Sequence, residues 1–226
     1  MSRFSLDVVY EDNHLLVVNK PAGLPTAGVP EGRDSLLELA RQYLIEKYHK
    51  PGNAFVGIVS RLDAPVSGIV LMARTSKAAR RLTEQFRERR VRKIYWAQVG
   101  GRVASPQGRW TDWLVHDERH RRMRIAQPGA EGAREARLRF RRLSSGGDST
   151  RLEITLETGR KHQIRLQAAT HGHPILGDRK YGSRVAFPQG IALHSRLLQF
   201  EHPVQKTPIE LVVPVPASWR SIDQGV

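Results

Sequence analysis

Residues 60–68 read Ser-Arg-Leu-Asp-Ala-Pro-Val-Ser-Gly and place an arginine and an aspartate in one short polar segment. Two apolar runs, 55–59 and 69–73, flank this segment, and their length and composition are typical of buried strands. Because successive side chains of an extended chain point in opposite directions, Arg61 and Asp63 would share one face. This arrangement suits a catalytic carboxylate at the end of a strand. The alternative is a plain turn in which Asp63 bonds to its own backbone.

Two further segments carry polar residues that packing alone does not readily explain. Tyr95 lies in the strand-like segment 93–99, where a half-buried core tyrosine is the alternative to a functional one. Residues 159–165 read Gly-Arg-Lys-His-Gln-Ile-Arg and lead towards Asp178 and Tyr181. A helix cap with solvated charges would explain part of this pattern, but the density of polar residues favours a functional site.

Motifs for cofactors and metals are missing from the sequence. There is no glycine-rich phosphate loop, no dinucleotide fingerprint, no His-Glu-x-x-His and no Gly-x-Ser-x-Gly. His171 and His173 form a pair, but Asp178 is the one carboxylate near them in the sequence. We therefore expect neither a metal site nor a cofactor.

The charge of the chain points to a polyanionic partner. The 226 residues include 37 Lys and Arg against 22 Asp and Glu, a formal net charge of +15 that is spread along the chain. Nucleic acid is the first candidate and an anionic membrane surface the second, although no basic amphipathic helix stands out. The absence of cysteine, of an apolar signal segment and of a membrane-spanning stretch predicts a soluble protein of the cytoplasm.

Hydrophobic periodicity and turn signals predict strands that mostly follow strands, with helices at intervals. The predicted strands are 6–10, 15–19, 55–59, 69–73, 93–99, 137–143, 151–156, 193–200 and 209–213, and the predicted helices are 36–48, 76–90 and 161–170. The polar, basic segment 116–135 is interpreted as a mobile loop or a recognition element. This order predicts an α+β fold, a single domain over 1–226 on a largely antiparallel mixed sheet, with flanking helices and an active-site cleft across the sheet.

Taken in order, these segments resemble the RluA-type family of RNA pseudouridine synthases. The resemblance rests on Asn-Lys-Pro-Ala-Gly-Leu at 19–24, Arg-Leu-Asp-x-x-x-Ser-Gly at 61–68, Lys-x-Tyr-x-Ala at 93–97, the segment 159–165, Pro-Ile-Leu-Gly-Asp-x-x-Tyr-Gly at 174–182 and Ala-Leu-His at 192–194. Two positions differ, because the family usually has His and Thr where this chain has Ser60 and Val66. The chain also starts directly in the catalytic domain, so we expect no separate N-terminal RNA-binding module.

The resemblance implies three catalytic residues. The essential aspartate corresponds to Asp63, which would act at the sugar either as a nucleophile at C1′ or as a base at C2′. Arg165 would be the charge partner of this carboxylate. Tyr95 would stack on the target base. Because the reaction gains and loses no atoms and includes no redox step, the resemblance implies neither a cofactor nor a metal.

The implied partner is structured RNA, either ribosomal or transfer RNA, bound by a monomer. Arg61 would fill the space of an extruded nucleotide or hold a phosphate. The other residues expected to contact RNA are Arg160, Lys161, His162, Gln163, Arg121 and Arg122, together with the basic helix at 76–90. A catalytically silent RNA-binding protein on the same scaffold is the alternative. A DNA-binding module is disfavoured by the lack of a helix-turn-helix or zinc finger.

Overall fold

The structure is a computed structural model that describes residues 4–30 and 32–219. Contacts divide the chain into two compact units. The first unit contains the described residues as far as Arg92 together with Ser195–Val215, and the second contains Lys93–His194 with the described residues from Pro216 onward. Among the residues described, no helix is both long and apolar enough to cross a membrane.

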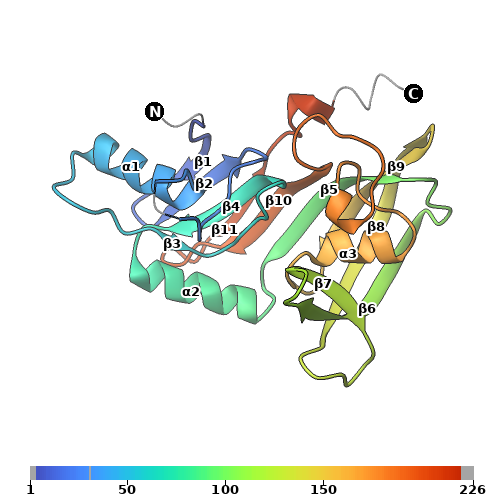
Figure 1. The fold of residues 1–226 in the computed structure, drawn as a ribbon. Coiled ribbons are helices and arrows are strands. Elements are labelled where there is room, and N and C mark those ends of the chain that lie inside the picture. Colours follow the sequence, from blue (N-terminus) through green and yellow to red (C-terminus); the bar gives the residue numbers. More distant parts are fainter. Residues whose placement is uncertain (1–3, 31, 220–226) are drawn as a thin grey trace. The chain divides into compact units, whose positions relative to one another are not determined.

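The first unit is built on a sheet with several antiparallel strand pairs (Figure 1). Its strands are β1 (Val8–Glu11), β2 (Leu15–Lys20), β3 (Gly57–Ile58), β4 (Ser67–Ala73), β10 (Leu193–Glu201) and β11 (Pro208–Val212). β1 pairs with β2, β2 with β4, and β10 with β11, and the short β3 also pairs with β4. β4 lies next to β10 in this sheet. Every residue of β4 is buried, as expected for a central strand.

Two helices pack in the first unit. Helix α1 (Leu36–Tyr48) begins at Ser35, whose side chain accepts a hydrogen bond from the Glu38 amide, the cap that the sequence predicts. Helix α2 (Ser76–Arg87) begins in the same way at Thr75. The core of the unit combines apolar side chains of β2, β4, α2, β10 and the residues beside them: Leu15, Val17, Ile69, Leu71, Ala73, Ala78, Leu82, Val91, Leu198, Phe200 and Val213.

The second unit contains a sheet of antiparallel strands (Figure 1). These strands are β5 (Arg92–Gly100), β6 (Gln107–Asp117), β7 (Arg122–Ala126), β8 (Arg134–Gly146) and β9 (Ser149–Leu156), paired in the order β5-β9-β8-β6-β7. Helix α3 (Gln163–Thr170) and the 3₁₀ turns η1 (Arg179–Tyr181) and η2 (Ala217–Trp219) complete the unit. Leu166 of α3 packs with Leu114 of β6, Met123 of β7 and Tyr181 of η1, which covers one part of the sheet.

The predicted α+β class and the largely antiparallel pairing are confirmed. One local prediction is wrong. The run 55–59 forms a strand only at Gly57–Ile58, and Phe55 is 50% exposed. The run contains Gly57, and a glycine inside a strand weakens it. The segment 116–135 contains the short strand β7, which pairs with β6, and turns or irregular backbone at 118–121 and 127–133. Its interpretation as a mobile loop or a recognition element stays a prediction.

Candidate active site

Asp63 lies in the loop 59–66 between β3 and β4, and both ends of this loop are fixed by hydrogen bonds. At its start, the amides of Val59 and Ser60 both donate to the Leu71 carbonyl at 3.1 Å, and the Ser60 hydroxyl accepts from the Leu71 amide at 2.8 Å. At its end, the Val66 amide donates to the Asp63 carbonyl at 3.0 Å. The Asp63 side chain is half-buried and Arg61 is exposed. The loop therefore presents Asp63 from a frame with little freedom.

The segment that follows β2 holds the same loop from a second direction. The Thr26 hydroxyl donates to the Leu62 carbonyl at 2.7 Å and accepts from the Leu62 amide at 3.2 Å. The Gly23 amide donates to the Ala64 carbonyl at 2.7 Å. These contacts bind the two residues on either side of Asp63, so they set the backbone position from which its carboxylate projects.

Lys20 also contributes hydrogen bonds that hold the Asp63 loop. The side chain is 0% exposed, and its ammonium donates to the carbonyls of Pro21, Leu24 and Ala64 at 2.9, 2.8 and 3.2 Å. Burial lowers the pKa of Lys20 to about 7, and the negative charge of Asp63 raises it against that effect. The ammonium form can donate all three hydrogen bonds, whereas a neutral amine has two N–H groups. In its protonated form Lys20 therefore supplies a positive charge beside the Asp63 loop.

The two positions at which this chain differs from the usual family pattern have structural roles. Ser60 closes the base of the loop through its hydroxyl, and Val66 is 2% exposed at the other end. Gly68 follows with a φ of +114°, and a Cβ atom there would lie 2.3 Å from the Ser195 carbonyl oxygen. Only glycine permits this approach of β4 to β10 directly after the loop. Both differing positions are therefore compatible with the Asp63 frame.

Tyr95 and Arg165 belong to the second unit, whereas Asp63 belongs to the first. Tyr95 lies on β5 opposite Ile154 of β9 and is 9% exposed. Its strand position agrees with the sequence, and its contact with a target base stays a prediction. The pairing of Arg165 with Asp63 also stays a prediction.

Arg165 forms a buried ion pair that the sequence analysis did not predict. Its Nε donates to Oδ2 of Asp178 at 2.7 Å and its Nη2 to Oδ1 at 2.9 Å, with the two side chains 6% and 1% exposed. The guanidinium carbon lies 5.1 Å from the centroid of the Tyr181 ring. A two-pronged bond of this kind fixes the plane of the guanidinium group. Asp178 and Tyr181 therefore orient Arg165, which explains the polar density seen in the sequence.

The residues at the start of α3 divide into exposed and buried groups. Lys161 is exposed, while Arg160 is half-buried and donates through Nε to the Glu135 carbonyl at 3.0 Å. Gln163 is 3% exposed, and its amide bonds to the Thr158 hydroxyl, the Arg160 amide and the Arg137 carbonyl at 2.8, 3.0 and 3.0 Å. Gln163 thus holds the helix start against β8, a role that differs from the RNA contact that the sequence predicts.

Arg121 lies in the turn before β7 and Arg122 is the first residue of β7, and both are exposed. The Met123 amide donates to the Tyr181 hydroxyl at 3.1 Å, and the same hydroxyl lies 2.7 Å from Nδ1 of His162. Lys180 also donates to the Arg121 carbonyl at 2.8 Å. The η1 turn thus anchors the tip of the β6–β7 hairpin near the start of α3.

The histidine pair considered as a metal site lies in separate contacts. His171 stacks on Trp110 with ring centroids 4.8 Å apart, and its Nε2 lies 3.1 Å from Oδ2 of Asp112. Nδ1 of His173 lies 3.0 Å from the Gly100 carbonyl oxygen. Within residues 4–30 and 32–219, no three His, Asp or Glu side chains gather in a way that could hold a metal ion.

Sequence and structure comparisons bear on this arrangement. Residues 14–170 match the family model described as RNA pseudouridylate synthase, a span that includes Asp63, Tyr95 and Arg165. The chain belongs to this family. The family assignment that the sequence motifs predict is therefore confirmed. The predicted enzyme class, an isomerase acting on uridine in RNA, is confirmed at the level of the family.

Individual relatives agree with the family assignment. The protein named ribosomal large subunit pseudouridine synthase D of Xylella fastidiosa is 38% identical, with 93% of this chain and 66% of the relative covered. The protein of the same name from Xanthomonas campestris pv. campestris is 37% identical, with 96% and 68% covered. The chain thus spans about two thirds of the length of these relatives. A solved structure titled Human RNA Pseudouridylate Synthase Domain Containing 4 has a TM-score of 0.79 at 24% identity and covers 96% of this chain and 93% of its own, which shows the common fold.

Local sequence patterns assign no role to the residues that hold the Asp63 loop. Lys20, Gly23 and Thr26 lie about forty positions before Leu62 and Ala64, so their hydrogen bonds with these two residues cannot be inferred from local periodicity. The signal in the sequence is a lysine at the end of the apolar strand β2, because a buried amine needs carbonyl partners.

Proposed function

We propose that this chain converts specific uridines in structured ribosomal RNA into pseudouridine, with Asp63 as the catalytic carboxylate. The observation that carries this proposal is the frame around Asp63, which Lys20, Gly23 and Thr26 hold through the backbone of its neighbours. A catalytic group must be held in one geometry to act efficiently, and a plain surface turn needs no such support. The names of the relatives support ribosomal RNA over transfer RNA as the substrate.

In the proposed reaction the glycosidic bond from N1 to C1′ breaks, the uracil turns, and a bond from C5 to C1′ forms. The proton on C5 leaves and N1 gains a proton, so the product is an isomer of the substrate. Asp63 would act at the sugar, either by attack on C1′ or by removal of the C2′ proton. Because the target base must leave its stack, the enzyme has to offset a cost of a few kcal/mol through its contacts with RNA.

Arg165 and Tyr95 have supporting roles in this proposal. The ion pair with Asp178 fixes the guanidinium plane of Arg165, and a fixed guanidinium is suited to hold a carboxylate ionised. Tyr95 would stack on the uracil ring. The reaction thus draws on one residue of the first unit and two of the second, and we propose that residues 1–226 act as one catalytic domain.

RNA contacts outside the reacting nucleotide would come from exposed basic residues. Arg61 is exposed two positions before Asp63, where it could fill the place of an extruded nucleotide or hold a phosphate. Lys161, Arg121 and Arg122 are exposed as well, and Arg160 and His162 lie beside Lys161 in the half-buried start of α3. We further propose that the protein acts as a monomer in the cytoplasm, which size-exclusion chromatography and cell fractionation would test.

The substitution Asp63→Asn tests the catalytic assignment. Asparagine keeps the size of the side chain and removes its charge, so pseudouridine formation should be abolished while RNA binding and the unfolding midpoint stay near those of the wild type. The measurement is the release of tritium from C5 of labelled uridine in large-subunit ribosomal RNA. Asp148→Asn, at an exposed turn of the second unit, is the matched control and should remain active.

Two results would contradict the proposal. If the Asp63→Asn variant formed pseudouridine as well as the control, Asp63 would not be the catalytic residue. If the wild-type protein bound RNA but converted no uridine, the alternative of a catalytically silent RNA-binding protein would replace this proposal.

A further inference from the structure

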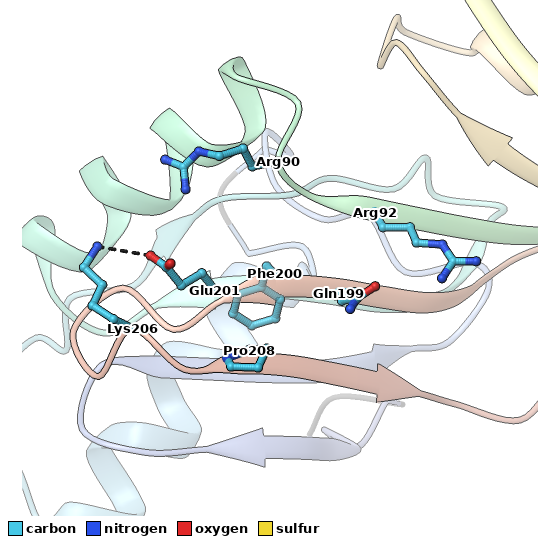
Figure 2. Close-up of a pocket in the computed structure, with 7 residues that line it drawn as sticks. All are labelled: Arg90, Arg92, Gln199, Phe200, Glu201, Lys206 and Pro208. Atoms are coloured by element: carbon cyan, nitrogen blue, oxygen red, sulfur yellow. Dashed lines mark hydrogen bonds and ion pairs between the residues drawn. The ribbon is translucent and has the colours of Figure 1, made fainter.

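A pocket of about 340 Å³ lies in the first unit, between the turn that follows α2 and the hairpin of β10 and β11 (Figure 2). None of its residues belongs to the Asp63 loop or to the segment that supports this loop. The residues that line it are Arg90, Arg92, Gln199, Phe200, Glu201, Lys206 and Pro208. The pocket is therefore a feature separate from the candidate catalytic residues.

Positive charge exceeds negative charge in this lining. Arg90, Arg92 and Lys206 contribute three cations, and Glu201 is the one carboxylate among the lining residues. Lys206 pairs with Glu201 at 3.2 Å, and Arg90 pairs with Glu88, outside the lining, at 2.6 Å. Arg92 is exposed and makes no side-chain hydrogen bond or ion pair with any residue that the structure describes. Figure 2 shows Arg90 and Lys206 on one side of Phe200 and Arg92 on the other.

Hydrogen bonds join helix α2 to the end of β10 and the turn after it, which form one wall of the pocket. Gln85 of α2 is 2% exposed, donates to the Glu201 carbonyl at 2.8 Å and accepts from the Glu201 amide at 3.0 Å. Arg81 of α2 donates to the Pro203 carbonyl at 2.8 Å. The backbone at Glu201 and Pro203 is therefore attached to α2 before any ligand binds.

The hairpin that carries Lys206 is fixed by a buried histidine. His202 is 0% exposed, and its Nδ1 accepts hydrogen bonds from the amides of Val204 and Gln205 at 3.2 and 2.8 Å. Its Nε2 lies 2.8 Å from Oδ2 of Asp12. Lys206 lies four residues after His202. Its backbone has a left-handed φ of 63°, and its amide donates to the His202 carbonyl at 3.1 Å. The backbone at Lys206 is thus part of a defined turn.

The excess charge of the pocket contrasts with the arginine-rich sheet of the second unit. There, Arg109, Arg137 and Arg139 all pair with Glu157, at 2.9, 3.3 and 2.6 Å. Arg141 pairs with Glu153 at 3.0 Å. Each of these four arginines thus has a carboxylate partner on or directly after β9, whereas the Arg92 side chain has no hydrogen bond or ion pair among the described residues.

We propose that this pocket binds backbone phosphates of the RNA substrate, at a contact separate from the reacting nucleotide. The inference rests on the proposed function, because it assumes an RNA partner. A guanidinium group and an ammonium group suit phosphate oxygens, and Glu201, the one carboxylate in the lining, is already paired with Lys206. The buried Phe200 and the exposed Pro208 add apolar surface between the basic side chains. On binding, Lys206 would exchange its contact with Glu201 for one with phosphate, and Arg92, which has no side-chain partner among the described residues, would bind a second phosphate oxygen.

The test compares two double variants that each remove two positive charges. Arg92→Gln with Lys206→Gln alters the pocket. Arg109→Gln with Arg141→Gln is the control, because it removes two arginines of the second unit that already pair with Glu157 and Glu153. Binding to a transcript of large-subunit ribosomal RNA is measured by fluorescence anisotropy over a range of salt concentrations. For the pocket variant we expect the slope of log affinity against log salt to fall by about 0.7–1.8, which corresponds to one or two phosphates. The control variant should keep a slope close to that of the wild type.

Equal slopes for the wild type and both variants, or an equal loss in both variants, would overturn the proposal, as would a wild-type protein that does not bind the transcript. Because binding is measured directly, the result does not depend on turnover. A wild type that binds RNA without forming pseudouridine would refute the proposed function and still allow the pocket to be tested. If the double variant does not fold, Arg92→Gln alone keeps the test, since Arg92 is exposed and has no side-chain partner among the described residues.

Discussion

Lys20 shows how a single buried charge can shape a catalytic loop. Its ammonium donates to Pro21 and Leu24 in its own segment and to Ala64 in the loop that carries Asp63. The lysine therefore joins two segments that lie more than forty residues apart, and it adds a positive charge near the carboxylate. Asp63 and the three carbonyl dipoles offset only part of the cost of burying this charge, because burial still lowers the pKa of Lys20 to about 7.

We predict that Lys20→Met destabilises the protein, and that the loss grows with pH. At pH 7 the variant leaves three carbonyls without their donor, which should cost about 1–3 kcal/mol. Burial lowers the pKa of Lys20 from 10.5 to about 7, so between these values the unfolded chain binds more protons than the folded one. Folding of the wild type therefore gains stability from this group as pH rises through that window, by up to about 1.4 kcal/mol per pH unit.

Urea unfolding of the wild type and of Lys20→Met at pH 7, 8 and 9 measures this difference. The gap in unfolding free energy should widen towards pH 9. A constant gap would mean that Lys20 titrates near its usual pKa, and that the carbonyls and Asp63 compensate for burial completely. Lys50→Met, at an exposed position after α1, is a control that should show no such trend.

Arg165 combines two roles that substitutions can separate. Arg165→Met should lower the unfolding free energy by about 3–5 kcal/mol, because it leaves the carboxylate of Asp178 buried without a partner. The double variant with Asp178→Asn should recover much of this stability, since it removes the unpaired charge. We expect the double variant to stay inactive in pseudouridine formation, because the proposed partner of Asp63 is still missing.

Arg165→Lys is the conservative companion to these variants. A lysine keeps the charge but cannot form the two-pronged bond with Asp178, so activity should stay low. Thermal unfolding and the tritium-release assay give the two readouts. Recovery of activity together with stability in the double variant would show that Arg165 acts only in folding.

At the scale of elements, the sequence predicts the order of strands and helices well but misjudges the run 55–59 and does not locate the short strand β7. The capped start of α1 at Ser35 and the core strands β2 and β4 follow from local patterns. The strand β7 does not, because only Met123 among its residues is buried and its ladder with β6 is a tertiary contact. The frame of Asp63 is likewise beyond local patterns, since hydrogen bonds from Lys20 and Thr26 join distant segments.

The tip of the β6–β7 hairpin offers a prediction about RNA contacts. Arg121 and Arg122 are exposed, while the backbone of the tip is anchored by bonds to Tyr181 and Lys180. We expect the double substitution of Arg121 and Arg122 by Gln to raise KM for RNA and reduce the salt dependence of binding, by a slope of about 0.7–0.9 for each phosphate lost. The kcat value should change little, because uniform binding is lost rather than transition-state stabilisation.

Steady-state kinetics at several salt concentrations provide this measurement. A large fall in kcat would show that the hairpin tip shapes the active site. Unchanged KM and salt dependence would show that the two arginines form a solvated surface.

For the whole molecule, the formal net charge of +15 indicates a polyanionic partner but not where that partner binds. The location depends on which cations have carboxylate partners, and this is a property of strand pairing. Glu157, directly after β9, pairs with arginines of β6 and β8, whereas Arg92 at the start of β5 lacks a side-chain partner among the described residues. Composition therefore predicts the class of ligand, and only the fold shows which basic side chains have carboxylate partners and which do not.

Independence from metals is also expected of the molecule as a whole. The proposed reaction conserves all atoms of the uridine and transfers no electrons to an acceptor, so acid–base and nucleophilic groups of the protein are sufficient for it. We expect protein that is purified and assayed in EDTA to keep full activity on a short RNA stem-loop that folds without Mg²⁺. Activity that is lost in EDTA and restored by a transition metal alone would contradict this expectation. It would make His171 and His173 the first residues to substitute, because each has a ring nitrogen within 3.1 Å of an oxygen atom that could orient it as a ligand.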